Sequence, residues 1–126
     1  LFLQKNLAVS GTEFVPMPIA FTEDDVAVLL DEPVSLQVVI SNEGNVDSYD
    51  VVVLILVTDE FEETVYESKN KISSIGPKES KIFLTDPINI EKGIQHEWFI
   101  KIEEIDDEEE LSDNLLSIYA FIPPES

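Results

Sequence analysis

Residues 34–45 read VSLQVVISNEGN, and this stretch decides the fold. Its first half alternates between an apolar side and a more polar side. The apolar side consists of Val34, Leu36, Val38 and Ile40, and the other side of Ser35, Gln37 and Val39. Alternation with a period of two predicts a half-buried β-strand. The strand ends in a polar turn, in which Gly44 can adopt a left-handed backbone conformation.

The next apolar stretch, residues 49–57, is hydrophobic on both faces and rich in β-branched side chains, which favours a strand over a helix. Such a strand is either central and covered on both sides or carries an exposed apolar patch, and both readings stay open. Weaker patterns of the same kind predict further strands at residues 7–20, 64–72, 80–85, 95–102 and 115–122. About seven strands separated by turn signals such as Gly76-Pro77 predict an all-β fold, an antiparallel β-sandwich.

The length and hydrophobicity of the chain limit the class of protein to which it can belong. With 126 residues, of which 44% are hydrophobic, the chain suits one folded domain over residues 1–126. Its longest apolar run, residues 51–57, is too short to cross a bilayer, so we expect no direct membrane insertion. The chain opens with Leu1 and closes with Pro-Pro-Glu-Ser, and we expect it to be excised from a longer polypeptide.

The charge of the chain excludes two kinds of partner. There are 27 acidic residues, seven lysines and no arginine, which gives a net charge of −20. This charge repels nucleic acids and anionic lipid surfaces. Adaptation to high salt would also explain a high acid content, although not its clustering. The chain has no cysteine, so disulfides and thiolate metal sites are impossible.

The densest acidic cluster lies at residues 103–113, where eight of eleven residues are acidic and a predicted strand lies on each side. Carboxylates held this close repel one another and resist ionising together. A hard divalent cation removes the repulsion, so the cluster predicts a metal site for one or two ions, with calcium expected. The expected ligands are Asp106, Asp107, Glu109 and Asp113. The alternative is a solvated acidic loop without metal.

Three segments together point to a known family. Residues 33–45 join an alternating strand to an Asn-Glu-Gly turn, residues 75–80 read IGPKES, and residues 102–114 contain the acidic cluster. In their order and spacing these segments resemble the CARDB family, the cell-adhesion-related domain of bacteria and archaea. The resemblance implies an immunoglobulin-like sandwich of about seven strands. It also implies placement in surface or secreted proteins, as a spacer or binding unit.

We therefore expect a non-catalytic structural or adhesion module of a larger cell-surface or secreted protein. Its expected partners are neighbouring domains of the same polypeptide, another surface protein or a glycan. The alternative is a carbohydrate- or ligand-binding accessory module of an exported enzyme, in which Trp98 or the second face of residues 51–57 contacts the ligand. We favour a core position for Trp98 and a partnered core or edge position for His96. We expect no catalytic activity, because the chain has neither cysteine nor a nucleophile-elbow motif.

Overall fold

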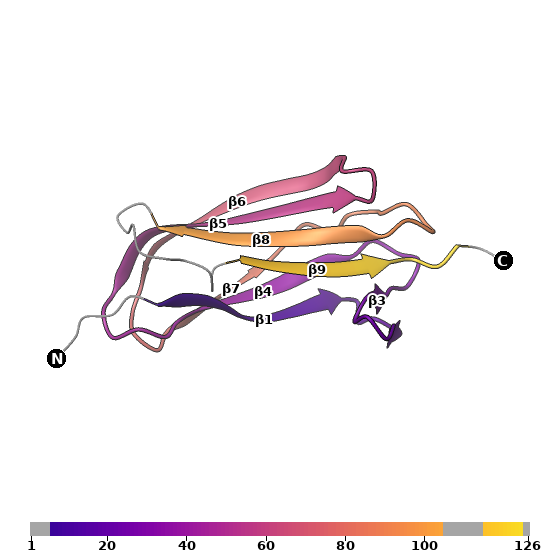
Figure 1. Ribbon diagram of the computed structural model, residues 1–126. Coiled ribbons are helices and arrows are strands. Elements are labelled where there is room, and N and C mark those ends of the chain that lie inside the picture. Colours follow the sequence, from indigo (N-terminus) through magenta and orange to yellow (C-terminus); the bar gives the residue numbers. More distant parts are fainter. Residues whose placement is uncertain (1–5, 105–114, 125–126) are drawn as a thin grey trace.

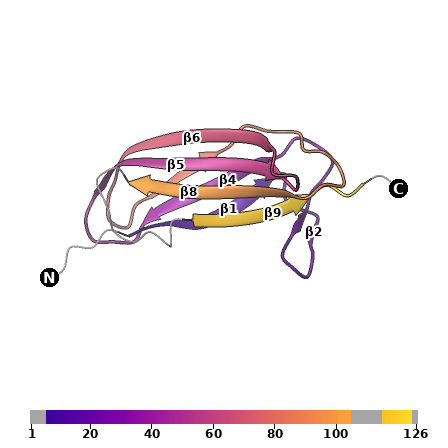
Figure 2. The same cartoon turned by 45° about the horizontal axis from the view of Figure 1, so that its top comes forward.

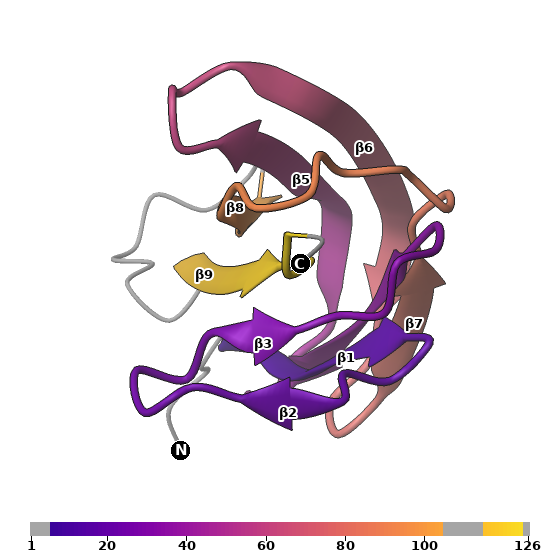
Figure 3. The ribbon, with the colours of Figure 1, turned by 90° about the vertical axis from the view of Figure 1, so that its right-hand side faces the viewer.

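The computed structural model describes residues 6–104 and 115–124, which form two packed β-sheets (Figure 1). The smaller sheet has three strands in the order β1 (Leu7–Val15), β4 (Ser35–Asn42) and β7 (Ser80–Leu84). The larger sheet has six strands in the order β2 (Ala20–Phe21), β3 (Ala27–Val28), β9 (Leu115–Phe121), β8 (His96–Glu104), β5 (Ser48–Asp59) and β6 (Thr64–Ile75). Figure 2 shows β6, β5, β8 and β9 side by side as one layer, and Figure 3 looks along the strands at the curved sandwich.

The predicted all-β sandwich is confirmed, with one addition. Seven strands have five residues or more, as expected. The two-residue strand β3 lies where the sequence predicted only a connection, and β2 begins at the last residue of the predicted segment 7–20. The chain leaves the smaller sheet after β1, at Pro16 and Pro18, which lack the N–H group that a ladder needs. It then joins the larger sheet, where β3 pairs with β9 in parallel. The sheets are therefore antiparallel except at this pair.

The core lies between the inner faces of the two sheets. The inner side chains of β4 and β5 are fully buried; they are Leu36, Val38 and Ile40, and Val51, Val53, Ile55 and Val57. Trp98 of β8 is also fully buried, and its ring meets that of Phe14 of β1 edge to face, with centroids 5.0 Å apart. Aromatic pairs favour this geometry, so the contact joins β1 of the smaller sheet to β8 of the larger sheet.

β4 and β5 differ on their outer faces. Ser41 of β4 lies in a row of hydroxyl groups, with Oγ–Oγ distances of 2.6 Å to Ser10 and 2.7 Å to Ser80. On β5 the outer face carries Val52, Leu54 and Leu56, all half-buried. Their cross-strand neighbours on β6 and β8 are mostly long charged residues: Lys71, Lys69 and Glu67, and Glu103, Lys101 and Phe99. The stems of such side chains cover apolar surface while their charges stay in water, so the second face of β5 is partly covered within the domain.

The turn after β4 is built around the side chain of Asn42, which is fully buried. Its Nδ2 donates to the carbonyl oxygens of Val46 at 2.8 Å and Ile75 at 2.9 Å, and its Oδ1 accepts from the N–H of Gly44 at 2.9 Å. The expectation of a left-handed Gly44 is wrong, because among the described glycines only Gly93 has a positive φ. Gly44 is instead buried beside the amide that shapes the turn.

Among the described residues, no helical segment has both the length and the apolar character needed to cross a lipid bilayer.

Candidate functional site

The three segments that resemble CARDB meet at one end of the sandwich, which we call the hairpin end. The turn after β4 contacts the turn between β6 and β7, because Lys78 N donates to Asn42 O at 2.8 Å and Asn42 N donates to Glu79 O at 2.9 Å. The end of β8 reaches the same place, since Glu104 pairs with Val51 near the start of β5. The hairpin end therefore combines segments from three distant parts of the sequence (Figure 1).

The acidic cluster connects two neighbouring antiparallel strands at the hairpin end. β8 and β9 pair as far as Lys101 and Leu115, so the sequence between these residues is the connection of a β-hairpin, as predicted. At the base of this hairpin, Glu103 of β8 lies beside Val52 of β5. The Oε2 atom of Glu103 is 3.3 Å from Lys101 Nζ. The predicted metal ligands Asp106, Asp107, Glu109 and Asp113 lie outside the described residues.

Described carboxylates at the hairpin end have local partners. Asp47 Oδ2 accepts from the hydroxyl of Tyr49 at 3.0 Å, and this hydrogen bond, with the carboxylate charge, raises the pKa of Tyr49. Glu79 Oε1 accepts from Gly76 N at 2.7 Å, which lowers the pKa of Glu79, and Lys81 lowers it further. Within residues 6–104 and 115–124, no group of three or more Asp, Glu or His side chains is arranged to hold a metal ion.

Two other acidic segments lie in turns at the opposite end of the sandwich (Figure 1). Residues 23–25, in the turn between β2 and β3, are exposed. Asp59, which begins the turn between β5 and β6, accepts from the backbone N–H groups of Phe61 and Glu63 at 2.8 and 3.0 Å. The Asp59 carboxylate therefore stabilises its own turn. Both acidic segments lie at the end of the sandwich opposite the acidic hairpin.

The face of β8 that carries His96 and Trp98 points into the core, as predicted. Both side chains are buried, and His96 Nδ1 lies 2.9 Å from Ile94 O. Trp98 is 0% exposed, so it offers no ring face on which a sugar could stack, and the part of the carbohydrate alternative that relied on Trp98 is wrong. Its Nε1 has no hydrogen-bond partner among the described residues.

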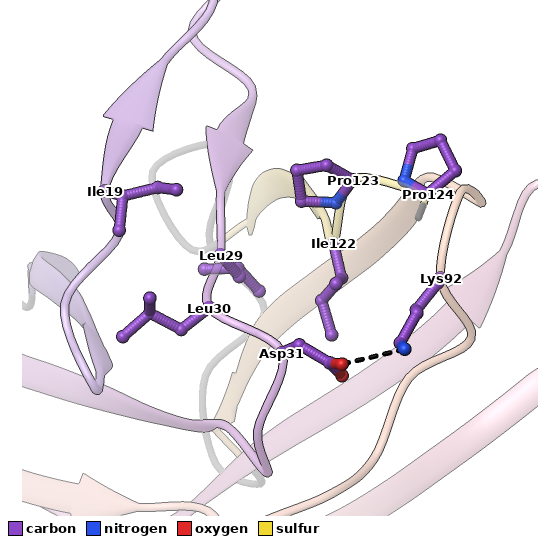
Figure 4. A pocket seen from close by; sticks show the side chains of 8 residues that line it. All are labelled: Ile19, Leu29, Leu30, Asp31, Lys92, Ile122, Pro123 and Pro124. Atoms are coloured by element: carbon purple, nitrogen blue, oxygen red, sulfur yellow. Dashed lines mark ion pairs between the residues drawn. The ribbon is translucent and has the colours of Figure 1, made fainter. Parts of the chain in front are cut away.

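A hollow of about 640 Å³, not anticipated from the sequence, lies at the end opposite the hairpin (Figure 4). It is lined by Ile19, Leu29, Leu30, Asp31, Lys92, Ile122, Pro123 and Pro124. Lys92 Nζ and Asp31 Oδ2 form an ion pair at 2.8 Å, and the remaining lining side chains are apolar. The hollow can therefore make apolar contacts, but no side-chain nucleophile with an adjacent base lines it. Its walls are distant in sequence and meet through the pairing of β3 with β9.

Comparison with known proteins supports the fold. No protein-family model and no curated protein matches the chain. Among solved structures, the chain is similar to the CARDB domain of the PF1109 protein from Pyrococcus furiosus, crystallised in complex with di-metal ions. The TM-score is 0.58, and the match covers 99% of both chains at 15% sequence identity. The chain has the fold of a CARDB domain, an immunoglobulin-like β-sandwich, and the resemblance noted in the sequence is confirmed at this level.

Proposed function

We propose that the chain is a non-catalytic structural or adhesion module of a larger cell-surface or secreted protein. The fold supports this proposal, because a sandwich with a continuous apolar core spaces its neighbours at a fixed distance and presents its edges and turns for contact. Among the described residues, the only histidine is buried against a backbone oxygen, and the hollow at the end opposite the hairpin is lined by no hydroxyl or thiol nucleophile. A fold alone does not define an activity, so the proposal also depends on the experiment below.

We also propose a divalent-cation site on the acidic hairpin, at residues 103–113. The observation that carries it is the position of the cluster: eight carboxylates within eleven residues connect two paired strands. The structural relative was crystallised with di-metal ions, which supports the same chemistry here. Carboxylate oxygens suit Ca²⁺, and Asp106, Asp107, Glu109 and Asp113 are the residues that would hold it.

The expected effect of the cation is electrostatic. Two unit charges 4 Å apart repel by about 1 kcal/mol in water, and by more near a protein surface, so the hairpin without cation is under repulsion from several such pairs. A bound Ca²⁺ supplies positive charge and oxygen coordination. Carboxylates that coordinate the same ion are held in one arrangement. The connection between β8 and β9 would then become more rigid.

A calcium titration followed by thermal melting tests the site. A ligand that binds only the folded state stabilises it by about 2.7 kcal/mol at 100 times its dissociation constant. We expect the melting temperature to rise with millimolar CaCl₂, and the rise to disappear in the double variant Asp106→Asn, Asp107→Asn. The matched control, Glu23→Gln with Asp24→Asn, removes the same charge from an exposed turn at the opposite end and should keep the rise.

Ionic strength must be separated from binding, because any salt screens a chain of net charge −20. NaCl at equal ionic strength measures this effect. An equal shift with both salts, or an equal shift in both double variants, would show screening without a site. Glycan-array binding by the isolated chain would instead support the carbohydrate alternative, through a surface other than Trp98.

A further inference from the structure

The outer edge of β7 presents unpaired backbone groups. Thr85 N donates to Leu36 O at 3.0 Å, which fixes one hydrogen-bonded pair at the end of the β4–β7 ladder. Such pairs alternate along antiparallel strands, so Leu84 and Ile82 lie in non-hydrogen-bonded pairs with β4. Their N–H and C=O groups therefore point away from β4. Among the described residues no strand pairs with this side of β7, which ends the smaller sheet.

The side chains at this edge are apolar and exposed. Ile82 is 65% exposed and Leu84 60%, and both belong to a five-residue edge strand. β6, one edge strand of the larger sheet, is different, because it displays Lys69 and Lys71, and charges on an edge discourage pairing with other chains. On β7 the single charged residue, Lys81, lies on the other face of the strand from Ile82 and Leu84, so β7 is less protected than β6.

β6 and β7 are neighbouring edges of the two sheets (Figure 3). Residues of both strands line a hollow of about 380 Å³. It is lined by Lys71, Ile72, Ser73, Ser74, Lys81, Ile82 and Phe83. Two of the seven lysines of the chain are in this lining and none of its 27 acidic residues. Lys81 Nζ lies 3.2 Å from Glu79 Oε2, whereas Lys71 has no ion pair within the described residues. The lining of the hollow therefore carries positive charge and no carboxylate, with Glu79 beside it paired to Lys81.

We propose that β7 binds an extended peptide segment of a partner protein, in which acidic and apolar residues alternate, as a fourth strand of the smaller sheet. The backbone of the segment bonds to the free N–H and C=O groups of Ile82 and Leu84, as in strand addition to other sheet edges. Because side chains alternate along a strand, its apolar residues lie beside Ile82 and Leu84. Its carboxylates point toward Lys71 and Lys81 in the hollow. This inference does not depend on the proposed cation site.

Charge argues against a second copy of the chain as the occupant. Pairing of β7 with β7 would bring two molecules of net charge −20 together and place two copies of Lys81 close to one another. Like charges facing each other across an interface disfavour association. A short acidic segment is also repelled by the net charge of the chain, but it brings far fewer charges than a second copy and no second Lys81.

Nuclear magnetic resonance of the whole ¹⁵N-labelled chain tests the proposal in the presence of EDTA, so that cations play no part. The probes are an acetylated peptide of alternating glutamate and valine and an equally long peptide of alternating lysine and valine. With the glutamate peptide, we expect the amide signals of Ile82 and Leu84 to shift and their hydrogen exchange to slow. The lysine peptide should bind at least about tenfold more weakly, since both lining charges repel it.

Variants distinguish strand addition from surface adsorption. Ile82→Pro removes an N–H that makes no bond to β4 and should abolish binding, while Ile82→Lys keeps the N–H, adds an edge charge and should weaken binding. Lys71→Glu should weaken binding of the glutamate peptide about tenfold. The matched control, Lys69→Glu, changes a lysine on the same strand but outside the hollow and should weaken binding about twofold at most.

Three results would overturn the proposal. The first is an Ile82→Pro chain that is folded and binds the peptide like the parent. The second is a set of peptide-induced shifts confined to strands other than β7. The third is a dimer of the peptide-free chain, detected by sedimentation, that both Ile82 variants dissociate, because the occupant of the edge would then be a second copy.

Discussion

β4 and β5, one interior strand from each sheet, have equally apolar inner faces but different outer faces. The inner side chains of both are fully buried. Outside, β4 carries Gln37, Val39 and Ser41, and β5 carries Val52, Leu54 and Leu56 beside the long side chains of β6 and β8. The inner faces therefore define the sandwich. The outer faces differ in chemistry, since two of the three side chains on β4 are polar and all three on β5 are apolar.

The sharpest test of this comparison is the removal of side-chain volume from the two faces of β5. Ile55→Ala opens a cavity in the core and should reduce the free energy of unfolding by about 2–5 kcal/mol. Leu54→Ala removes a half-buried side chain whose site can refill with water and lysine stems, so we expect roughly 1 kcal/mol. Urea denaturation measures both. Equal losses would mean that the outer face is covered as completely as the inner one.

A substitution in the turn between β4 and β5 should have the next largest effect on stability. Asn42→Ala removes the amide that bonds to Gly44, Val46 and Ile75, and leaves two buried carbonyl oxygens and one N–H without this partner. We expect a loss of about 2 kcal/mol by the same measurement. Glu43→Ala changes the next, exposed residue of the same turn and serves as the control. A loss as small as that of the control would contradict the role given to Asn42.

The smallest expected effect is a pH-dependent change in stability caused by Glu79, in the turn between β6 and β7. The pKa of Glu79 is lowered, first by the N–H of Gly76 and then by Lys81. A carboxylate with a lowered pKa stabilises the fold above its unfolded pKa of about 4.3, and this stabilisation is lost as the pH falls through the folded value. The melting temperature of Glu79→Gln should therefore lie below that of the parent near pH 6 and converge with it in acid. Glu91→Gln removes the same charge and is the control.

Nuclear magnetic resonance separates the two causes of that lowered pKa. In Lys81→Met the carboxyl of Glu79 should still titrate below the ordinary value, because the larger cause, the N–H of Gly76, is retained. A return to the ordinary value in this variant would assign the effect to the lysine instead.

Period-two patterns were sufficient to predict β4 and β8, because the residues that alternate in sequence are the ones that the structure buries, whereas β5 was predicted from a continuous run of apolar, β-branched residues. The short strands β2 and β3 were missed, since two residues cannot show a period and their pairing depends on β9, more than eighty residues away in the chain. For the candidate site, the hairpin at residues 103–113 followed from its flanking strands. The hollow between β6 and β7 could not be predicted, because it depends on how two edges in different sheets face each other.

The position of β9 within the larger sheet has a consequence for synthesis of the chain. β9 is the last strand in the described sequence, yet it lies between β3 and β8. Until it emerges from the ribosome, β8 has one open edge and β3 has no neighbour on that side. We therefore expect the nascent chain to stay incompletely closed through most of translation, with its apolar interior accessible to chaperones. Closure of the sandwich is then the last event, made by the final strand entering between two that already exist.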